Sequence, residues 1–118
     1  MIVGSVTEAG VPVVPFPVAD QEWRATIDTG FNGDLELPEP LRPFVNARFI
    51  GRTRFLLAAG QTAIEDTFLV SVPFDGDTAL AETTFTSASE ILVGTGMLKA
   101  HRLEIHFPNR LLTLERME

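Results

Sequence analysis

The feature that most constrains this chain is the regular alternation of short apolar runs with turn residues. Within the runs, apolar and polar side chains alternate with the period of a half-buried strand. The alternation is clearest where Leu103, Ile105 and Phe107 are separated by Glu104 and His106. Short strands with turn signals at near-regular spacing are typical of a small β-barrel or β-sandwich. The sequence therefore predicts an all-β fold.

The individual elements follow from the same pattern. Residues 47–58 and 62–72 indicate a β-hairpin with Gly60 at its tip, and three prolines in residues 11–18 favour an edge strand. Residues 38–43 predict a proline-rich connection, and residues 78–89 have too little periodicity to assign. Residues 95–100 predict one short helix near the C-terminus. The other expected strands are residues 1–7, 23–27, 35–37, 91–93, 103–107 and 112–114.

Composition limits the classes of function. A chain of 118 residues with 45% hydrophobic residues predicts a single domain over residues 1–118. The net charge is −7 without a basic cluster, which argues against nucleic acid as a partner. Cysteine is absent, and the apolar tract of residues 11–19 is too short and proline-rich to span a membrane. We expect a cytoplasmic protein without membrane association or cofactor. We also expect no metal, since only His101 and His106 could offer imidazole ligands.

Residues 25–30 predict a strand that runs inward and ends on an acidic tight turn, Asp28-Thr29-Gly30. Aspartate and glycine are common at turns, so a purely structural turn is one interpretation. A serine hydrolase built on Ser87 or Ser89 is disfavoured, because no glycine elbow or orienting acid surrounds them. The weight of the turn depends on the motifs that follow it.

The order of these motifs resembles the retropepsin-like aspartic proteases in their bacterial single-domain form. The acidic turn is followed by a glycine-tipped hairpin, then by Leu92-Val93-Gly94, a short helix and a terminal hairpin. The resemblance covers residues 11–115. It implies a small closed β-barrel of the acid-protease type with one short C-terminal helix.

The resemblance also implies a homodimer that hydrolyses peptide or protein substrates. One Asp-Thr-Gly supplies half of a carboxylate pair, so a two-fold axis would bring two Asp28 side chains together. Thr29 would form hydrogen bonds across that axis, and Gly30 would let the substrate backbone approach. The apolar terminal strands, around residues 2–3 and 112–114, are the expected interface.

The remaining site residues are implied in the same way. The hairpin would be a flap over the substrate, and Leu92, Val93 and Gly94 would pack behind the Asp28 turn. Retroviral members place a small residue where this chain has Phe31, and an acid and an arginine where it has Asn32 and Thr95. The residues expected to bind substrate are Phe31, Asn32, Ala58, Ala59, Gly60 and Gln61.

Two functions fit this interpretation. The first is an aspartic endopeptidase that activates water with paired Asp28 carboxylates. The alternative is a non-catalytic dimeric module on the same fold that binds peptides or supports assembly. Turnover of peptide separates the two.

Overall fold

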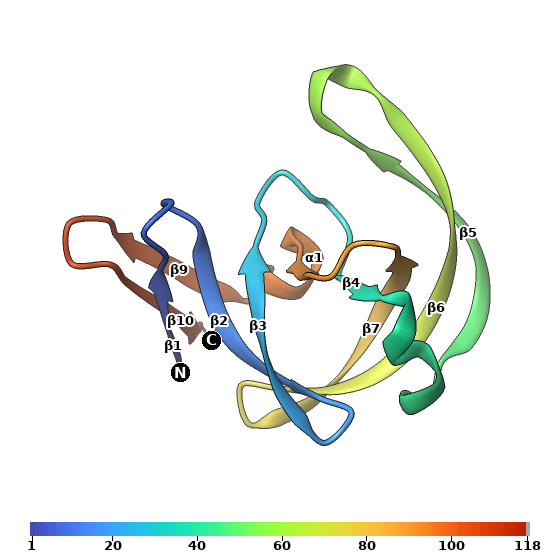
Figure 1. Cartoon of the computed structure of the whole chain (residues 1–118), viewed down its shortest axis with the longest axis horizontal. Helices are drawn as coiled ribbons and strands as arrows, with labels where there is room; N and C mark the ends of the chain where they lie inside the picture. The colour runs from blue at the N-terminus through green and yellow to red at the C-terminus, as the bar shows by residue number, and fades with distance from the viewer. Residues whose placement is uncertain (118) are drawn as a thin grey trace.

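The computed structural model describes residues 1–117 and contains ten strands in one hydrogen-bonded sheet (Figure 1). The strands are β1 (Ile2–Val6), β2 (Pro12–Val18), β3 (Gln21–Ile27), β4 (Leu35–Pro38), β5 (Arg48–Leu56), β6 (Thr62–Phe74), β7 (Asp77–Thr86), β8 (Ile91–Val93), β9 (His101–His106) and β10 (Leu111–Arg116). The helical elements are α1 (Thr95–Leu98) and the 3-10 turns η1 (Glu39–Phe44) and η2 (Ala58–Gly60). No helix within residues 1–117 is long and apolar enough to cross a membrane.

The sheet is strongly curved, but it does not close. Its hydrogen-bonded order is β5-β6-β7-β4-β8-β3-β2-β1-β10-β9. Strands β5 and β9 are the two edges, and the β5–β6 hairpin projects away from the body of the protein (Figure 1). The prediction of a mainly β fold is confirmed, whereas the prediction of a closed barrel is not.

The core lies inside this curved sheet and follows the alternation of the strands. Val14 and Phe16 of β2 are almost fully buried, as are Val70 and Val72 of β6. The Phe16 ring packs against Phe74 of β6, with the ring centres 6.2 Å apart. The two halves of the sheet therefore meet through β2 and β6.

The prolines of β2 do not place it at an edge, contrary to the prediction. Strand β2 lies between β3 and β1. Its pairing with β1 involves only Pro12 and Val13, so Pro15 and Pro17 have no partner strand on that side. A missing N–H is tolerated there because no ladder hydrogen bond is required.

Strand β7 occupies most of the segment that the sequence left unassigned. It pairs with β6 in antiparallel and with β4 in parallel orientation. Thr83 and Thr84 are buried, and the Thr83 hydroxyl donates a hydrogen bond to the Ala81 carbonyl at 3.0 Å. The core positions of β7 are therefore partly filled by threonine, which hides the apolar alternation.

The terminal strands pair with each other inside one chain. Strand β1 is antiparallel to β10, with Ile2 opposite Leu114 and Gly4 opposite Leu112. Leu112 and Leu114 are fully buried in the core of the chain, while Val3 points outward. The expectation that residues 112–114 form a dimer interface through apolar contact is therefore wrong for these two leucines.

Candidate active site

The Asp28 turn begins where β3 leaves the sheet. The backbone N–H of Asp28 donates to the Val93 carbonyl at 2.9 Å, which continues the parallel pairing of β3 with β8. The N–H of Gly30 donates to the Asp28 Oδ1 atom at 2.9 Å, and the N–H of Phe31 donates to the Asp28 carbonyl at 3.2 Å. Asp28 is half-buried and Thr29 is exposed. The turn thus holds one carboxylate at the end of a buried strand.

The loop after the turn is tied to the segment after β8 by backbone hydrogen bonds. The N–H of Gly94 donates to the Asp34 carbonyl at 2.9 Å, and the N–H of Thr95 donates to the Phe31 carbonyl at 2.9 Å. Thr95 is half-buried, and Asn32 is exposed. Main-chain hydrogen bonds therefore connect the Asp28 loop to the segment after β8.

Only glycine fits at position 94, because the neighbouring atoms leave no room for a Cβ atom. A Cβ atom there would lie 2.1 Å from the Gly33 carbonyl oxygen and 2.6 Å from the Phe31 ring. Both distances are far below van der Waals contact, and the first involves backbone. The two segments can approach this closely only because Gly94 has no side chain.

A pocket of about 310 Å³ opens beside the Asp28 carboxylate. The Asp28 turn forms one side, the hairpin forms another, and β4 and β8 form the floor. Most of the lining is apolar, as is usual for sites that bind organic ligands. The lining residues are Asp28, Gly30, Phe31, Glu36, Leu56, Leu57, Ala58 and Leu92.

The pocket includes some of the residues expected from sequence and omits others. The expected residues that line it are Asp28, Gly30, Phe31, Ala58 and Leu92. The expected residues that lie outside it are Thr29, Asn32, Ala59, Gly60 and Gln61, which are exposed, and Val93 and Gly94, which are buried behind the turn. Leu92 differs from Val93 and Gly94, because it lines the pocket instead of packing behind the turn.

Three lining residues were missed by the sequence interpretation: Glu36, Leu56 and Leu57. The alternation of Leu35, Glu36 and Leu37 places Glu36 opposite the core face, but it does not show that this face borders Asp28. Leu56 and Leu57 directly precede the hairpin tip. Their proximity to the tip was the available signal.

The hairpin is anchored to the Asp28 loop at its base. The Phe55 ring of β5 packs against the Phe31 ring, with centres 5.6 Å apart and planes inclined by 49°. Both rings are buried. Phe31 therefore occupies the space beside the turn and also holds the hairpin in place.

The hairpin tip is a tight turn with two residues in the left-handed region. Ala59 has φ 59° and ψ 27°, and Gly60 has φ 74°. The Gln61 N–H donates to the Ala58 carbonyl at 3.3 Å. Two consecutive positive φ values are those of a type I′ turn, which suits the twist of a β-hairpin.

No family model matches the chain, and no curated protein matches it by sequence. Solved structures do match it. A retropepsin-like aspartic protease from Rickettsia conorii superposes with a TM-score of 0.62 at 15% identity, covering 95% of this chain and 87% of that one. The retroviral protease-like domain of Ddi1 from Leishmania major gives 0.51 at 17% identity, covering 90% and 93%. This chain has the retropepsin-like fold.

A third match lies within a longer protein. The foamy viral protease–reverse transcriptase, solved with an RNA/DNA hybrid, gives a TM-score of 0.56 at 19% identity. The match covers 78% of this chain and 12% of the viral one.

The electrostatics of the pocket are dominated by acids. Burial raises the pKa of Glu36, and the negative charges of Glu65 and Asp28 raise it further. Within residues 1–117 neither Asp28 nor Glu36 forms an ion pair. The pocket of this retropepsin-like fold therefore holds two carboxylates without a cation.

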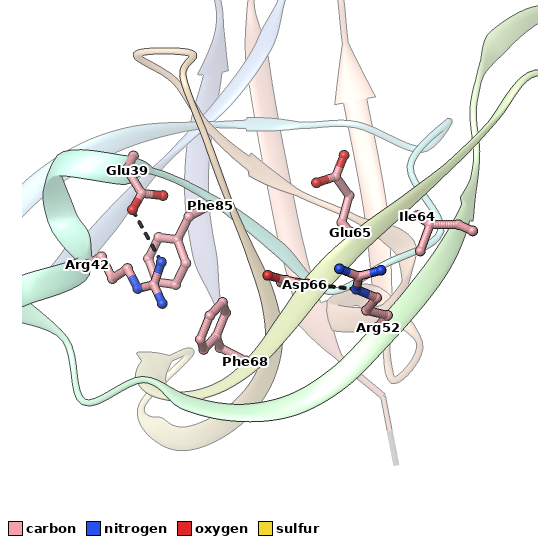
Figure 2. Close-up of a pocket in the computed structure, with 8 residues that line it drawn as sticks. All are labelled: Glu39, Arg42, Arg52, Ile64, Glu65, Asp66, Phe68 and Phe85. Carbon is pink, nitrogen blue, oxygen red and sulfur yellow. Dashed lines mark hydrogen bonds and ion pairs between the residues drawn. The ribbon is translucent and has the colours of Figure 1, made fainter.

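A second hollow, of about 430 Å³, lies between η1 and the hairpin and is lined by both acidic residues and arginines (Figure 2). The Arg42 guanidinium lies 4.4 Å from the centre of the Phe68 ring and 3.4 Å from the Glu39 carboxylate. On the hairpin side, Arg52 contacts Asp66 at 3.2 Å (Figure 2). Both arginines already have a carboxylate partner, and Arg42 also contacts Phe68 of β6, so this hollow does not resemble a catalytic site.

Proposed function

We propose that this protein is an aspartic endopeptidase that acts as a homodimer. The observation that carries the proposal is the half-buried Asp28 carboxylate, which lines a mostly apolar pocket beneath a projecting hairpin in a retropepsin-like fold. In the retropepsin-like proteases that the sequence resembles, an Asp-Thr-Gly turn faces the bound peptide. Fold alone does not establish activity, so the proposal rests on the site.

The chemistry requires two carboxyl groups. One deprotonates the attacking water, and the other protonates the carbonyl oxygen of the scissile bond. Two adjacent carboxyl groups that share one proton supply both roles, because like charges in contact do not both ionise easily. The chain contains a single Asp-Thr-Gly, so the second Asp28 would come from a partner chain across a two-fold axis.

The position of the turn is compatible with such an axis. Thr29 is exposed beside the half-buried Asp28, where its hydroxyl is free to reach a partner turn. Gly30 lines the pocket and offers backbone without side-chain bulk. Thr29 and Gly30 thus complete the proposed catalytic turn.

The substrate would be an extended peptide that lies between this turn and the hairpin. Phe31, Leu92 and Ala58 line the pocket and would contact substrate side chains near the scissile bond. Asn32 and the tip residues 59–61 are exposed at the rim, where they would contact the peptide farther from the bond. Backbone pairing with a hairpin edge is a common mode of peptide recognition.

The test compares the wild-type protein with Asp28→Asn on a peptide library, from acidic to neutral pH. The asparagine side chain would keep an oxygen that accepts the Gly30 N–H, so folding and dimerisation should be retained. It cannot exchange a proton with water, so cleavage should be lost. Asp66→Asn is the matched control, because Asp66 is an exposed carboxylate on the hairpin.

Thermal melts and sedimentation velocity accompany the assay. Cleavage by wild type and by Asp66→Asn, together with inactive, folded and dimeric Asp28→Asn, supports the proposal. Equal cleavage by Asp28→Asn removes Asp28 from the mechanism. Wild-type protein that binds peptides without cutting any of them at any pH supports the non-catalytic binding module instead.

A further inference from the structure

Glu36 is directed into the Asp28 pocket by the strand that carries it. Its neighbours Leu35 and Leu37 are fully buried in the core, so the side chain of Glu36 points to the opposite face of β4. On that face Glu36 lies beside Leu92 of the antiparallel strand β8. Both side chains line the pocket together with Asp28.

The Glu36 carboxylate lacks a partner in residues 1–117. Its side chain forms neither a hydrogen bond nor an ion pair with any described residue, although it is half-buried. The charged groups that act on it are Glu65 from the hairpin and Asp28 from the turn, and both are negative. A half-buried carboxylate in such surroundings is stabilised by any cation that reaches it.

The rest of the lining suits a long side chain with a charged end. Leu56 and Leu57 from the hairpin and Leu92 from the floor offer apolar surface. Lysine and arginine can pack an aliphatic stem against such a surface while the charged group contacts a carboxylate.

We infer that Glu36 selects substrates with a lysine or arginine side chain beside the scissile bond. This inference rests on the proposed peptidase function, because the pocket that Glu36 lines is the one beside Asp28. In a two-fold dimer each chain contributes one Glu36, so a basic residue would be accepted on either side of the bond.

The test uses peptide pairs that differ only in lysine or norleucine at each position flanking the scissile bond. At one or more positions the wild-type protein should cleave the lysine peptide about tenfold more efficiently in kcat/KM, as expected for one charge-assisted contact. In Glu36→Gln the ratio should fall to about one. Glu36→Leu should prefer norleucine. Glu22→Gln is the matched control, because Glu22 is an exposed glutamate on β3 outside this pocket, and it should keep the wild-type ratio.

A parallel binding measurement separates this inference from the peptidase proposal. Fluorescence anisotropy records the affinity of the same uncut peptides for Asp28→Asn, with and without Glu36→Gln. A lysine preference that disappears with Glu36→Gln supports the inference even where wild type cleaves nothing. Wild-type cleavage without any lysine preference overturns the inference and leaves the peptidase proposal standing. Equal loss of cleavage for all peptides in Glu36→Gln and Glu36→Leu, with normal melts, also overturns it, because selection then is not the role of Glu36. Absence of both cleavage and lysine-dependent binding overturns it as well.

Discussion

Replacement of Gly94 by alanine tests how closely the Asp28 loop is held. The new Cβ atom would lie 2.1 Å from the Gly33 carbonyl oxygen and 2.7 Å from the Phe31 carbonyl oxygen. Both neighbours are backbone atoms, so a side-chain rotation cannot relieve the contact. The loop must move away from the segment after β8.

That movement disrupts three backbone hydrogen bonds between the two segments. They join Gly94 to Asp34, Thr95 to Phe31, and Gly96 to Gly33, at 2.9, 2.9 and 3.0 Å. At about 1 kcal/mol for each bond, the loss is about 3 kcal/mol in the free energy of unfolding. With about 4 °C per kcal/mol for a domain of this size, the melting temperature should fall by roughly 12 °C.

The assay is thermal unfolding followed by circular dichroism, with Gly30→Ala as the matched control. A Cβ atom at Gly30 would contact only the Asp28 Oδ1 atom, at 3.3 Å, so this variant should lose less than about 1 kcal/mol. Because the loop carries Asp28, Gly94→Ala should also lower peptide cleavage below the melting transition. A Gly94→Ala protein that melts within about 2–3 °C of the wild type, a loss of less than about 1 kcal/mol, would refute the argument from contact.

Three further perturbations follow from the geometry. Glu36→Gln should raise the melting temperature at neutral pH and have less effect in acid. Burial and nearby acids raise the pKa of Glu36, so its contribution to stability is full below its pKa in the unfolded state and is lost as the pH rises through its pKa in the folded state. An equal gain at every pH would contradict this. Ala59→Asn should stabilise the hairpin tip by roughly 1 kcal/mol, since asparagine tolerates the left-handed conformation of Ala59 better than alanine does, and slower hydrogen exchange at the tip would show it. Phe55→Ala should destabilise by about 3 kcal/mol and speed exchange throughout the hairpin, because the contact with Phe31 is lost; unchanged exchange would show that this contact does not anchor the hairpin.

Local patterns in the sequence predicted those elements that are determined by neighbouring residues. The hairpin of β5 and β6 and the strand before Asp28 followed from alternation and from the glycine of each turn. Strand β7 could not be predicted in this way, because Thr83 and Thr84 fill core positions where apolar residues would have made the alternation visible. Threonine can do so because the Thr83 hydroxyl is satisfied by a backbone carbonyl.

The candidate site was predicted at Asp28 and only partly around it. Glu36 enters the pocket because β4 lies between the parallel strand β7 and the antiparallel strand β8, and sequence periodicity does not reveal this order. The burial of Leu112 and Leu114 likewise depends on the pairing of β1 with β10 across the whole length of the chain. Both features are long-range pairings, which a local pattern cannot specify.

The contact between Phe31 and Phe55 limits what the proposed enzyme could admit. If the hairpin opens as a lid, it bends beyond Phe55, so its moving part is residues 56–62. From Phe55 to Ala59 the arm is four residues, or about 13 Å at 3.3 Å for each residue. So short an arm gives passage to a single extended strand and not to a folded domain, whose radius of gyration alone is of that size. Cleavage would then be confined to tails, linkers and unfolded stretches. A target segment would have to be unfolded before any of its side chains could be recognised.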